Sequence, residues 1–322
     1  MGGTERPVRV RVPATSANLG PGFDSLGLAL SLHDDVDAWI RPSGLSVEVL
    51  GEGAGLVGAG EEHLVVRAMR AAFGITGGQP PGIGLRCVNR IPHGRGLGSS
   101  AAAIVAGILA ARALAARGPG KLPDDAVFRL ATGLEGHPDN VAACLGGGLT
   151  VAWMAAGGPR MVRLDPAPWI TPVVCVAPSP VRTDVARGRL PDVVPHRDAA
   201  ANAGRSALLV AALTQHRTAP HEAMSLLLDA TEDWLHQGYR VGAMPETDAL
   251  VRSLRAAGLP AVVSGAGPSV LVLLDAREGL DRHHLDSLGS IVKETGIAWH
   301  ISSLDVERQG ARVLRPEPPS GC

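Results

Sequence analysis

The chain has 322 residues, of which 45% are hydrophobic and 19% are charged, the composition of a globular protein with two domains or one large domain. General disorder is excluded because it requires low hydrophobicity and a high net charge, whereas the net charge here is -1. Without a positive field, and with only 3% aromatic residues for base stacking, we expect no nucleic-acid partner.

The first half of the chain is predicted to contain strands and helices separated by glycine-rich turns. Val8–Val12 alternates apolar and charged residues, which predicts a strand with one buried face, and Pro13 is expected to end it. The elements predicted after it are a strand over Leu45–Leu50, a helix over Glu62–Phe73, a strand over Ile83–Ile91, an Ala-rich helix over Ser99–Arg117 and a helix over Asp124–Leu134.

The pattern changes after Met161, and we place a domain boundary near residue 165. The elements predicted beyond it are a strand over Pro172–Ala177, helices over Asp198–Leu213, His221–Leu235 and Glu246–Ala257, and strands over Ala261–Val263, Val270–Leu274 and Ala298–Ser302. We expect domains over residues 1–165 and 166–310 and a disordered tail over residues 311–322. Because helices and strands do not alternate regularly enough for a doubly wound sheet, the expected fold class is α+β.

The cysteines and the apolar stretches argue against a secreted or membrane protein. Cys87, Cys144, Cys175 and Cys322 form no C-x-x-C pair, and their spacings fit neither a zinc site nor a disulfide framework. The longest apolar stretch, Ala101–Ala111, is too short to span a bilayer, and the N-terminus lacks the apolar run of a signal peptide. We expect a cytoplasmic protein with no membrane partner.

The strongest motif lies between a predicted strand and the Ala-rich helix. It consists of Pro92, His93, Gly94, Arg95, Gly96, Leu97, Gly98, Ser99, Ser100, Ala101 and Ala102. Three alternating glycines let backbone N–H groups converge, and a helix N-terminus adds unpaired N–H groups and a partial positive charge. This arrangement suits a polyphosphate, and the Ser100 hydroxyl can bind Mg²⁺. The alternative is an ordinary turn with a serine N-cap, which we rank lower because the glycines and serines stand together.

A second motif, Glu135–Asn140, follows a predicted helix and reads Glu-Gly-His-Pro-Asp-Asn. A hard cation bound to phosphates needs a protein carboxylate, and Glu135 is the candidate, with Ser100 as the other ligand. Taken alone, Glu135 is better explained as a solvated residue at the C-terminal end of a helix. Asp139 and His137 are weaker candidates, because Asp139 can cap the next segment and a histidine beside proline is more often structural.

Two further small-residue segments follow predicted strands. Ser264–Ser269 contains Gly265 and Gly267, which permit close backbone approach to a ligand or another loop, although in isolation a tight turn explains them. Residues 13–27 are small and polar, and Asn18 and Asp24 can reach a small polar substrate. An Asx-turn with a surface acid is the plainer interpretation of that segment.

These four segments resemble the motifs of the GHMP kinase superfamily, named for galactokinase, homoserine kinase, mevalonate kinase and phosphomevalonate kinase. Residues 92–102 are similar to its phosphate-binding motif, and Ser264–Ser269 is similar to its C-terminal glycine motif. Residues 12–24 and 135–142, with several later stretches, are most similar to the homoserine kinases within the superfamily. The resemblance covers residues 8–305.

The resemblance implies a fold, a reaction and cofactors. The fold would be α+β with two domains, the N-terminal half like the second domain of ribosomal protein S5 and the C-terminal half ferredoxin-like. The reaction would be transfer of the γ-phosphoryl group of ATP, with Mg²⁺, to the side-chain hydroxyl of L-homoserine in threonine biosynthesis. A homodimer is a further expectation, since family members are often dimers.

Carried over residue by residue, the resemblance assigns five polar residues to the amino-acid pocket: Asn18, Asp24, Asn140, Arg187 and Arg240. Either arginine can grip the carboxylate with its planar fork, and Asp24 can pair with the ammonium. Asn140 can hydrogen-bond the reacting hydroxyl but cannot act as a base. Asn140 and Arg187 are therefore the candidate catalytic residues, acting by positioning and charge stabilisation, with Asp139 as a base left open.

The resemblance also implies contacts with ATP and the metal. Residues 92–102 would hold the phosphates, Gly265 and Gly267 would be further nucleotide contacts, and Ser100 and Glu135 would bind Mg²⁺. Glu62 stands where an Asn near the adenine is expected.

Three other functions remain open at this point. A kinase of the same fold could act on another small alcohol, although the presence of Asn18, Asp24, Arg187 and Arg240 favours an amino acid. A non-catalytic ATP or metabolite sensor is disfavoured by the presence of Ser100 and Glu135. A purely structural protein would not need three converging glycine-rich loops.

Overall fold

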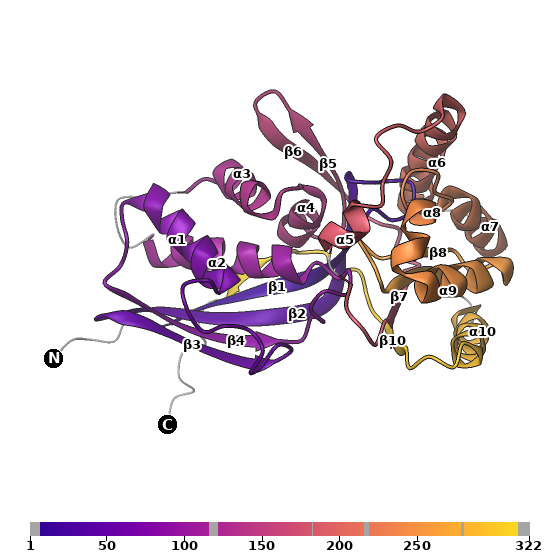
Figure 1. Ribbon diagram of the computed structural model, residues 1–322. Coiled ribbons are helices and arrows are strands. Elements are labelled where there is room, and N and C mark those ends of the chain that lie inside the picture. Colours follow the sequence, from indigo (N-terminus) through magenta and orange to yellow (C-terminus); the bar gives the residue numbers. More distant parts are fainter. Residues whose placement is uncertain (1–6, 116–121, 182, 216–218, 278–279, 315–322) are drawn as a thin grey trace.

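The computed structural model describes residues 7–115, 122–181, 183–215, 219–277 and 280–314, and it contains two β-sheets with helices packed on them (Figure 1). The strands are β1 Val8–Ala17, β2 Leu26–Arg41, β3 Gly44–Gly51, β4 Gly82–Asn89, β5 Leu149–Ala155, β6 Gly158–Leu164, β7 Ile170–Val176, β8 Ala261–Val263, β9 Val270–Asp275, β10 His300–Ser303 and β11 Arg312–Leu314. The helices are α1 Leu64–Thr76, α2 Ser99–Ala115, α3 Asp124–Glu135, α4 Asp139–Gly146, α5 Thr183–Arg187, α6 His196–Thr214, α7 Pro220–Ala230, α8 Gln237–Arg240, α9 Pro245–Ala256 and α10 Leu280–Glu294, with a 3₁₀ turn over Val241–Ala243.

The first sheet has the strand order β11-β1-β2-β4-β3, with β5 paired to β2 and β6 paired to β5. Only the β3–β4 pair is parallel among these described strands. Helices α1 to α4 lie over one face of this sheet (Figure 1). Val10 and Val12 of β1 and Ile104 and Ile108 of α2 are buried in the core between sheet and helices. The alternation of the first strand thus buries the face that the helices cover.

The second sheet has the order β10-β7-β9-β8, and its described pairs are all antiparallel. Numbered along the chain this is the order 4-1-3-2, which is the ferredoxin-like arrangement. Alternate residues of β9 face two cores: Leu271 and Leu273 join the core that continues from the first sheet, whereas Val270 and Val272 join the core beneath α9 and α10. The α+β fold class is confirmed.

Two elements differ from the sequence predictions. β1 does not end at Pro13 but runs on to Ala17, because the register with β2 shifts between Pro13 and Ala14 and this bulge accommodates the proline. The helix predicted over His221–Leu235 ends at Ala230. Beyond it the Asp233 carboxylate accepts backbone N–H groups of residues 235–237, which starts the short helix α8 instead.

The expected disordered tail is wrong for its first residues. β11 pairs antiparallel with the edge of β1, placing Val313 opposite Val10, and Ala311 N–H donates to the Cys144 carbonyl at 2.7 Å. The physical reason is that an uncovered edge strand has unpaired backbone groups that these residues satisfy. Residues 315–322 lie outside the described residues.

The boundary near residue 165 stays a prediction. β6 of the first sheet ends at Leu164, and β7 of the second sheet begins at Ile170. None of the described helices is long and apolar enough to cross a membrane.

Candidate active site

The loop between β4 and α2 has three glycines in the left-handed region, with φ of 66° at Gly94, 72° at Gly96 and 68° at Gly98. A Cβ atom at Gly96 would lie 2.1 Å from the Ser264 carbonyl oxygen. At Gly98 it would lie 1.9 Å from Thr15 Oγ1. Glycine is therefore required here by both backbone conformation and close approach.

The glycine-rich segments contact one another, as the spacing of their small residues allows. The Ser264 hydroxyl donates to the Gly96 carbonyl at 2.7 Å, and Gly265 N–H donates to the Ala17 carbonyl at 3.1 Å. Thr15 N–H donates to the Leu97 carbonyl at 3.1 Å. Three loops that are far apart in the sequence are thereby fixed to each other at the start of α2.

A cavity of about 130 Å³ lies where these loops meet; we call it the polar cavity. It is lined by Asn18, Gly94, Gly96, Gly98, Ser99, Ser100, Glu135, His137, Asp139, Asn140, Arg187, Arg240, Gly265 and Ala266. The first-turn N–H groups of α2 have no partner within the helix, so this wall of the cavity can bind an anion. The cavity unites residues from all four sequence motifs.

Several residues of the predicted nucleotide motif do not line the polar cavity. Leu97, Ala101 and Ala102 have buried side chains, so only their backbones are available to a ligand. The Arg95 guanidinium donates to the carbonyls of residues 177, 178 and 93 and thus fixes the loop to the segment after β7. Pro92 and Gly267 are also outside the lining, and His93 faces a second cavity.

Ser100 and Glu135 form a candidate cation site. Ser100 Oγ donates to Glu135 Oε1 at 2.5 Å, and burial raises the pKa of Glu135 above its ordinary value. Burial penalises the charged form of Glu135 more than the hydrogen bond from Ser100 and the charge of His137 stabilise it, and a bound cation would offset that penalty. No cluster of three or more His, Cys, Asp and Glu side chains suited to a metal occurs in the part of the chain that is described. One carboxylate and one hydroxyl fit Mg²⁺, which takes its remaining ligands from phosphates and water.

Beside this pair, the start of α4 places a second carboxylate and an amide in the cavity wall. Asp139 is fully buried, and its Oδ1 accepts from the Asn140 N–H and from His137 Nδ1, each at 2.7 Å. Burial alone would lower the pKa of His137, but Asp139 and Glu135 raise it above its ordinary value. Thr15 Oγ1 donates to Asn140 Oδ1 at 2.7 Å, which orients the Asn140 amide.

Two arginines, Arg187 and Arg240, also line the polar cavity. Arg187 makes a bidentate ion pair with Asp24, at 2.6 and 3.1 Å, which raises the pKa of Arg187. Asp24 itself is outside the lining. Asn18, in the left-handed region at φ 68°, donates to the Gly265 carbonyl at 2.7 Å and accepts the Asp24 N–H at 3.0 Å. The ion pair places both partners at the rim where a small charged ligand would meet them.

Arg240 is only 1% exposed although it lines the cavity. Burial, together with the charge of Arg187, lowers its pKa to about 10. Arg240 Nη1 lies 3.1 Å from His236 Nδ1 and 3.4 Å from the Gly265 carbonyl oxygen. Among the described residues no carboxylate forms an ion pair with Arg240, although Asp24, Asp233 and Asp139 are near enough to stabilise its charge, so the site holds a buried cation without a direct ionic partner.

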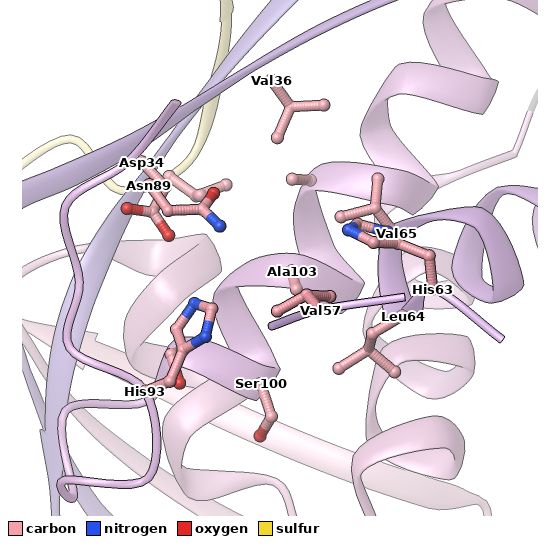
Figure 2. A pocket seen from close by; sticks show the side chains of 13 residues that line it. Asp34, Val36, Val57, His63, Leu64, Val65, Asn89, His93, Ser100 and Ala103 are labelled. Atoms are coloured by element: carbon pink, nitrogen blue, oxygen red, sulfur yellow. The ribbon is translucent and has the colours of Figure 1, made fainter. Parts of the chain in front are cut away.

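A second cavity of about 220 Å³, the apolar cavity, also reaches the start of α2, and Figure 2 shows the side chains that line it, among them His63, His93 and Ser100. It is lined by Val12, Asp34, Val36, Val57, His63, Leu64, Val65, Asn89, His93, Ser99, Ser100, Ala103 and Ala106. The two cavities share Ser99 and Ser100. Glu62 is exposed and outside the lining, whereas the adjacent His63 is buried, and burial followed by the charge of His93 lowers its pKa.

Sequence reasoning missed Thr15, His236 and Phe23, which contact site residues without lining the polar cavity. Thr15 and Phe23 lie within the segment 13–27, and His236 precedes Arg240 by one helical turn. That i, i+4 spacing was a usable signal. The contacts of Phe23 depend on tertiary packing, so no local sequence signal predicts them.

Comparisons with known proteins agree on the family. A family model described as GHMP kinases N terminal domain matches residues 63–148, and one described as GHMP kinases C terminal matches residues 208–296. A homoserine kinase of Streptomyces coelicolor is 55% identical over 307 residues, covering 95% of this chain and 94% of the relative. A homoserine kinase of Clavibacter michiganensis is 54% identical over 312 residues, covering 96% and 95%.

Solved structures agree as well. The crystal structure of homoserine kinase from Cytophaga hutchinsonii aligns with a TM-score of 0.82 and 26% identity, covering 98% of this chain and 99% of that one. The crystal structure of L. major mevalonate kinase shares the fold, with a TM-score of 0.64 and 16% identity over 96% of this chain and 100% of that one. The chain belongs to the GHMP kinase family and, within it, to the homoserine kinases.

Proposed function

We propose that this chain transfers the γ-phosphoryl group of ATP to the side-chain hydroxyl of L-homoserine, giving O-phospho-L-homoserine in threonine biosynthesis. One observation carries the proposal: the polar cavity joins an anion-binding helix start to a pair of arginines within about 130 Å³. A phosphoryl donor and a small amino acid can therefore meet there.

The nucleotide is assigned to both cavities. The triphosphate takes the glycine loop and the α2 N-terminus, and the nucleobase takes the adjoining apolar cavity, since Ser99 and Ser100 border both. Mg²⁺ would be held by Ser100 and Glu135, and when bound it neutralises charge on the phosphates.

The amino acid is assigned to the part of the polar cavity that Arg187 and Arg240 line. Arg187 and Arg240 supply forks for its carboxylate, and Asp24 at the rim supplies a partner for its ammonium. Because Arg187 and Asp24 pair with each other in this structure, a zwitterion would exchange with an existing ion pair rather than bury new charges. Asn18 adds a polar wall beside them.

The chemistry assigned to the chain is positioning and charge stabilisation. Asn140, oriented by Thr15, hydrogen-bonds the acceptor hydroxyl, and Arg187 adds positive charge near the reacting groups. Phosphoryl transfer has a loose transition state, so a strong base is not required. If a protein group accepts the proton, Asp139 is the candidate, because its Oδ2 is buried and has no hydrogen-bond partner among the described residues.

The acceptor is tested directly. The purified protein with Mg-ATP should release ADP in the presence of L-homoserine and not in its absence. Turnover that is equal or better with another small alcohol would replace the assigned substrate. Cytoplasmic location and a homodimer remain expectations. A reducing compartment is supported by Cys87, Cys144 and Cys175, which are buried and free.

The metal role of Glu135 gives the first mutational prediction. Glu135→Gln keeps the size of the side chain and its contact with Ser100 but removes the charge, so kcat should fall at least about 100-fold, on the order of 3 kcal/mol. Glu294→Gln, an exposed residue at the end of α10, is the control and should leave kcat unchanged. Near-normal turnover of Glu135→Gln with an intact fold would remove the residue from the metal site.

A further inference from the structure

We propose that His236 and Phe23 are positioning residues that hold Arg240 charged and facing the substrate carboxylate, and thereby set the preference of the site for alcohols that carry a carboxylate. The inference rests on the proposed function, which already assigns Arg240 to the carboxylate. It adds the two residues that make this arginine available.

Arg240 differs from an arginine that protein contacts satisfy, such as the half-buried Arg255. Arg255, for comparison, donates to Thr231 Oγ1 and to the Leu228 carbonyl, both at 2.8 Å. Arg240 instead has one protein contact at 3.1 Å, to an imidazole nitrogen, and a long one at 3.4 Å, and its buried Nε has no hydrogen-bond partner among the described residues. A guanidinium that is 1% exposed and so poorly satisfied calls for an anion in the cavity that it lines.

The hydrogen bonds of His236 fix its tautomer. His236 Nε2 lies 2.8 Å from the Gly20 carbonyl oxygen, and since a carbonyl only accepts, Nε2 carries the proton. Nδ1 then carries a lone pair, which accepts a hydrogen bond from Arg240 Nη1. A neutral imidazole therefore orients the guanidinium without cancelling its charge, as a carboxylate in the same place would.

The charges around His236 support a neutral ring. It is fully buried, and burial lowers its pKa. The Asp233 Oδ1 atom is 3.7 Å from Nε2, but the Asp233 carboxylate is occupied by backbone N–H groups of residues 235–237. Arg240 opposes protonation of the ring, and Asp24, which favours it, is engaged by Arg187.

Phe23 contacts His236 and both arginines of the polar cavity. Its ring stacks on His236 with centroids 5.1 Å apart and an interplanar angle of 25°. The Cζ atoms of Arg240 and Arg187 lie 5.4 and 5.6 Å from the same ring centroid. The negative face of an aromatic ring attracts a guanidinium but supplies no anion, so Phe23 holds two like charges near one cavity without itself competing with a carboxylate for either of them.

The test compares two substrates, L-homoserine and its carboxamide, in which the carboxylate is replaced by a neutral amide. His236→Phe keeps an aromatic ring for stacking on Phe23 but removes the nitrogen that accepts from Arg240. Phe23→Leu keeps apolar volume but removes the aromatic ring. For each variant we expect kcat/KM on L-homoserine to fall at least tenfold, mainly through KM, while kcat/KM on the carboxamide changes less than threefold. His236→Gln, whose amide can accept from Arg240, should recover part of the preference.

A merely structural role would lower kcat/KM on both substrates by the same factor, and that result would overturn the inference. Unchanged kinetics on L-homoserine would also overturn it. If the unmodified protein does not phosphorylate L-homoserine at all, the proposed function fails, and the inference about substrate preference fails with it.

The tautomer is measured independently of activity. Two-bond ¹H–¹⁵N spectra of the full-length, ligand-free protein at pH 7 should show His236 neutral, with the proton on Nε2. A proton on Nδ1, or a doubly protonated ring, would overturn the positioning role even if the enzyme is an active homoserine kinase.

Discussion

At the residue scale, the two arginines of the polar cavity are held by opposite means. Arg187 is neutralised by a bidentate contact with Asp24, which raises its pKa, whereas Arg240 is buried beside a neutral histidine and has its pKa lowered to about 10. Arg187 can exchange Asp24 for an anionic group of a ligand. Arg240 has no ionic partner until such a ligand binds. We expect this asymmetry to favour a ligand with both a negative and a positive group.

Gly98 offers a direct test of the glycine loop. Gly98→Ala requires a left-handed alanine, which costs about 1–2 kcal/mol, and puts a Cβ atom 1.9 Å from Thr15 Oγ1 and 3.0 Å from Asn140 Oδ1. Overpacking of this kind costs about 1–3 kcal/mol. We expect lower stability in urea unfolding and a large loss of turnover, because Thr15 and Asn140 are displaced.

The control for this substitution is Gly133→Ala. Gly133 lies in α3 and does not have a positive φ, and a methyl group added to it would meet no atom of a neighbouring element within 4 Å. This change should stabilise the protein by about 0.5–1 kcal/mol. A Gly98→Ala variant that is as stable and as active as the unmodified protein would contradict the geometry of the loop.

His63 in the apolar cavity predicts a dependence of stability on pH. Burial, and then the charge of His93, lowers its pKa, and its Nδ1 has no hydrogen-bond partner among the described residues. Above about pH 6.5 the ring is neutral in both folded and unfolded protein. Below that, the unfolded state takes up a proton that the folded state resists, so the free energy of unfolding falls as the pH falls.

Denaturant titrations between pH 7.5 and 5 measure this dependence. His63→Leu should flatten the fall relative to the unmodified protein, whereas His300→Leu, on the exposed strand β10, should not. An identical slope for His63→Leu and the unmodified protein would show that the folded state does not resist protonation of His63.

At the scale of elements, the pattern of the sequence predicted most helices but not the longest strand. β2 spans Leu26–Arg41 and contains His33, Asp34 and Asp35, which interrupt the apolar alternation. Asp34 is buried because its Oδ1 accepts the backbone N–H groups of residues 90 and 91, a long-range contact that no local pattern reports. The helices were easier to predict because their apolar periodicity is local.

β11 lies where the sequence analysis expected a disordered tail. Its pairing with β1 leads to a prediction about stability. A chain ending after Gly310 loses the pairing of β11 with β1 and the hydrogen bond from Ala311 N–H to the Cys144 carbonyl. Because a backbone hydrogen bond contributes about 1 kcal/mol net, we expect unfolding to require about 2–3 kcal/mol less than in a chain ending after Leu314. Equal thermal and urea midpoints for the two truncated chains would show that the strand does not stabilise the sheet.

At the scale of the whole molecule, the candidate site is formed where both halves of the chain meet. Ser264 from the loop between β8 and β9 donates to Gly96, and Arg95 reaches the carbonyls that follow β7. The sequence motifs predicted which loops carry polar and flexible residues, and Ser100, Glu135, Asn140, Arg187 and Arg240 do lie around one cavity. Their individual roles stay predictions.

The remaining features of the site could not be predicted because they depend on tertiary packing. Asp24 and Arg187 are far apart in the sequence, and no pattern shows that they form an ion pair with each other. The same holds for Phe23 between two guanidinium groups. The family resemblance drew attention to Glu62 near the adenine, but Glu62 is exposed and it is the adjacent, buried His63 that lines the apolar cavity.

The account depends most on where the triphosphate binds, and a crystal structure of the protein with Mg²⁺, L-homoserine and a non-hydrolysable ATP analogue measures this directly. We predict phosphates on the backbone of residues 94–100, the metal between Ser100 and Glu135, and the homoserine carboxylate on Arg240. A nucleotide bound elsewhere, with the start of α2 covered by packed side chains, would contradict the account.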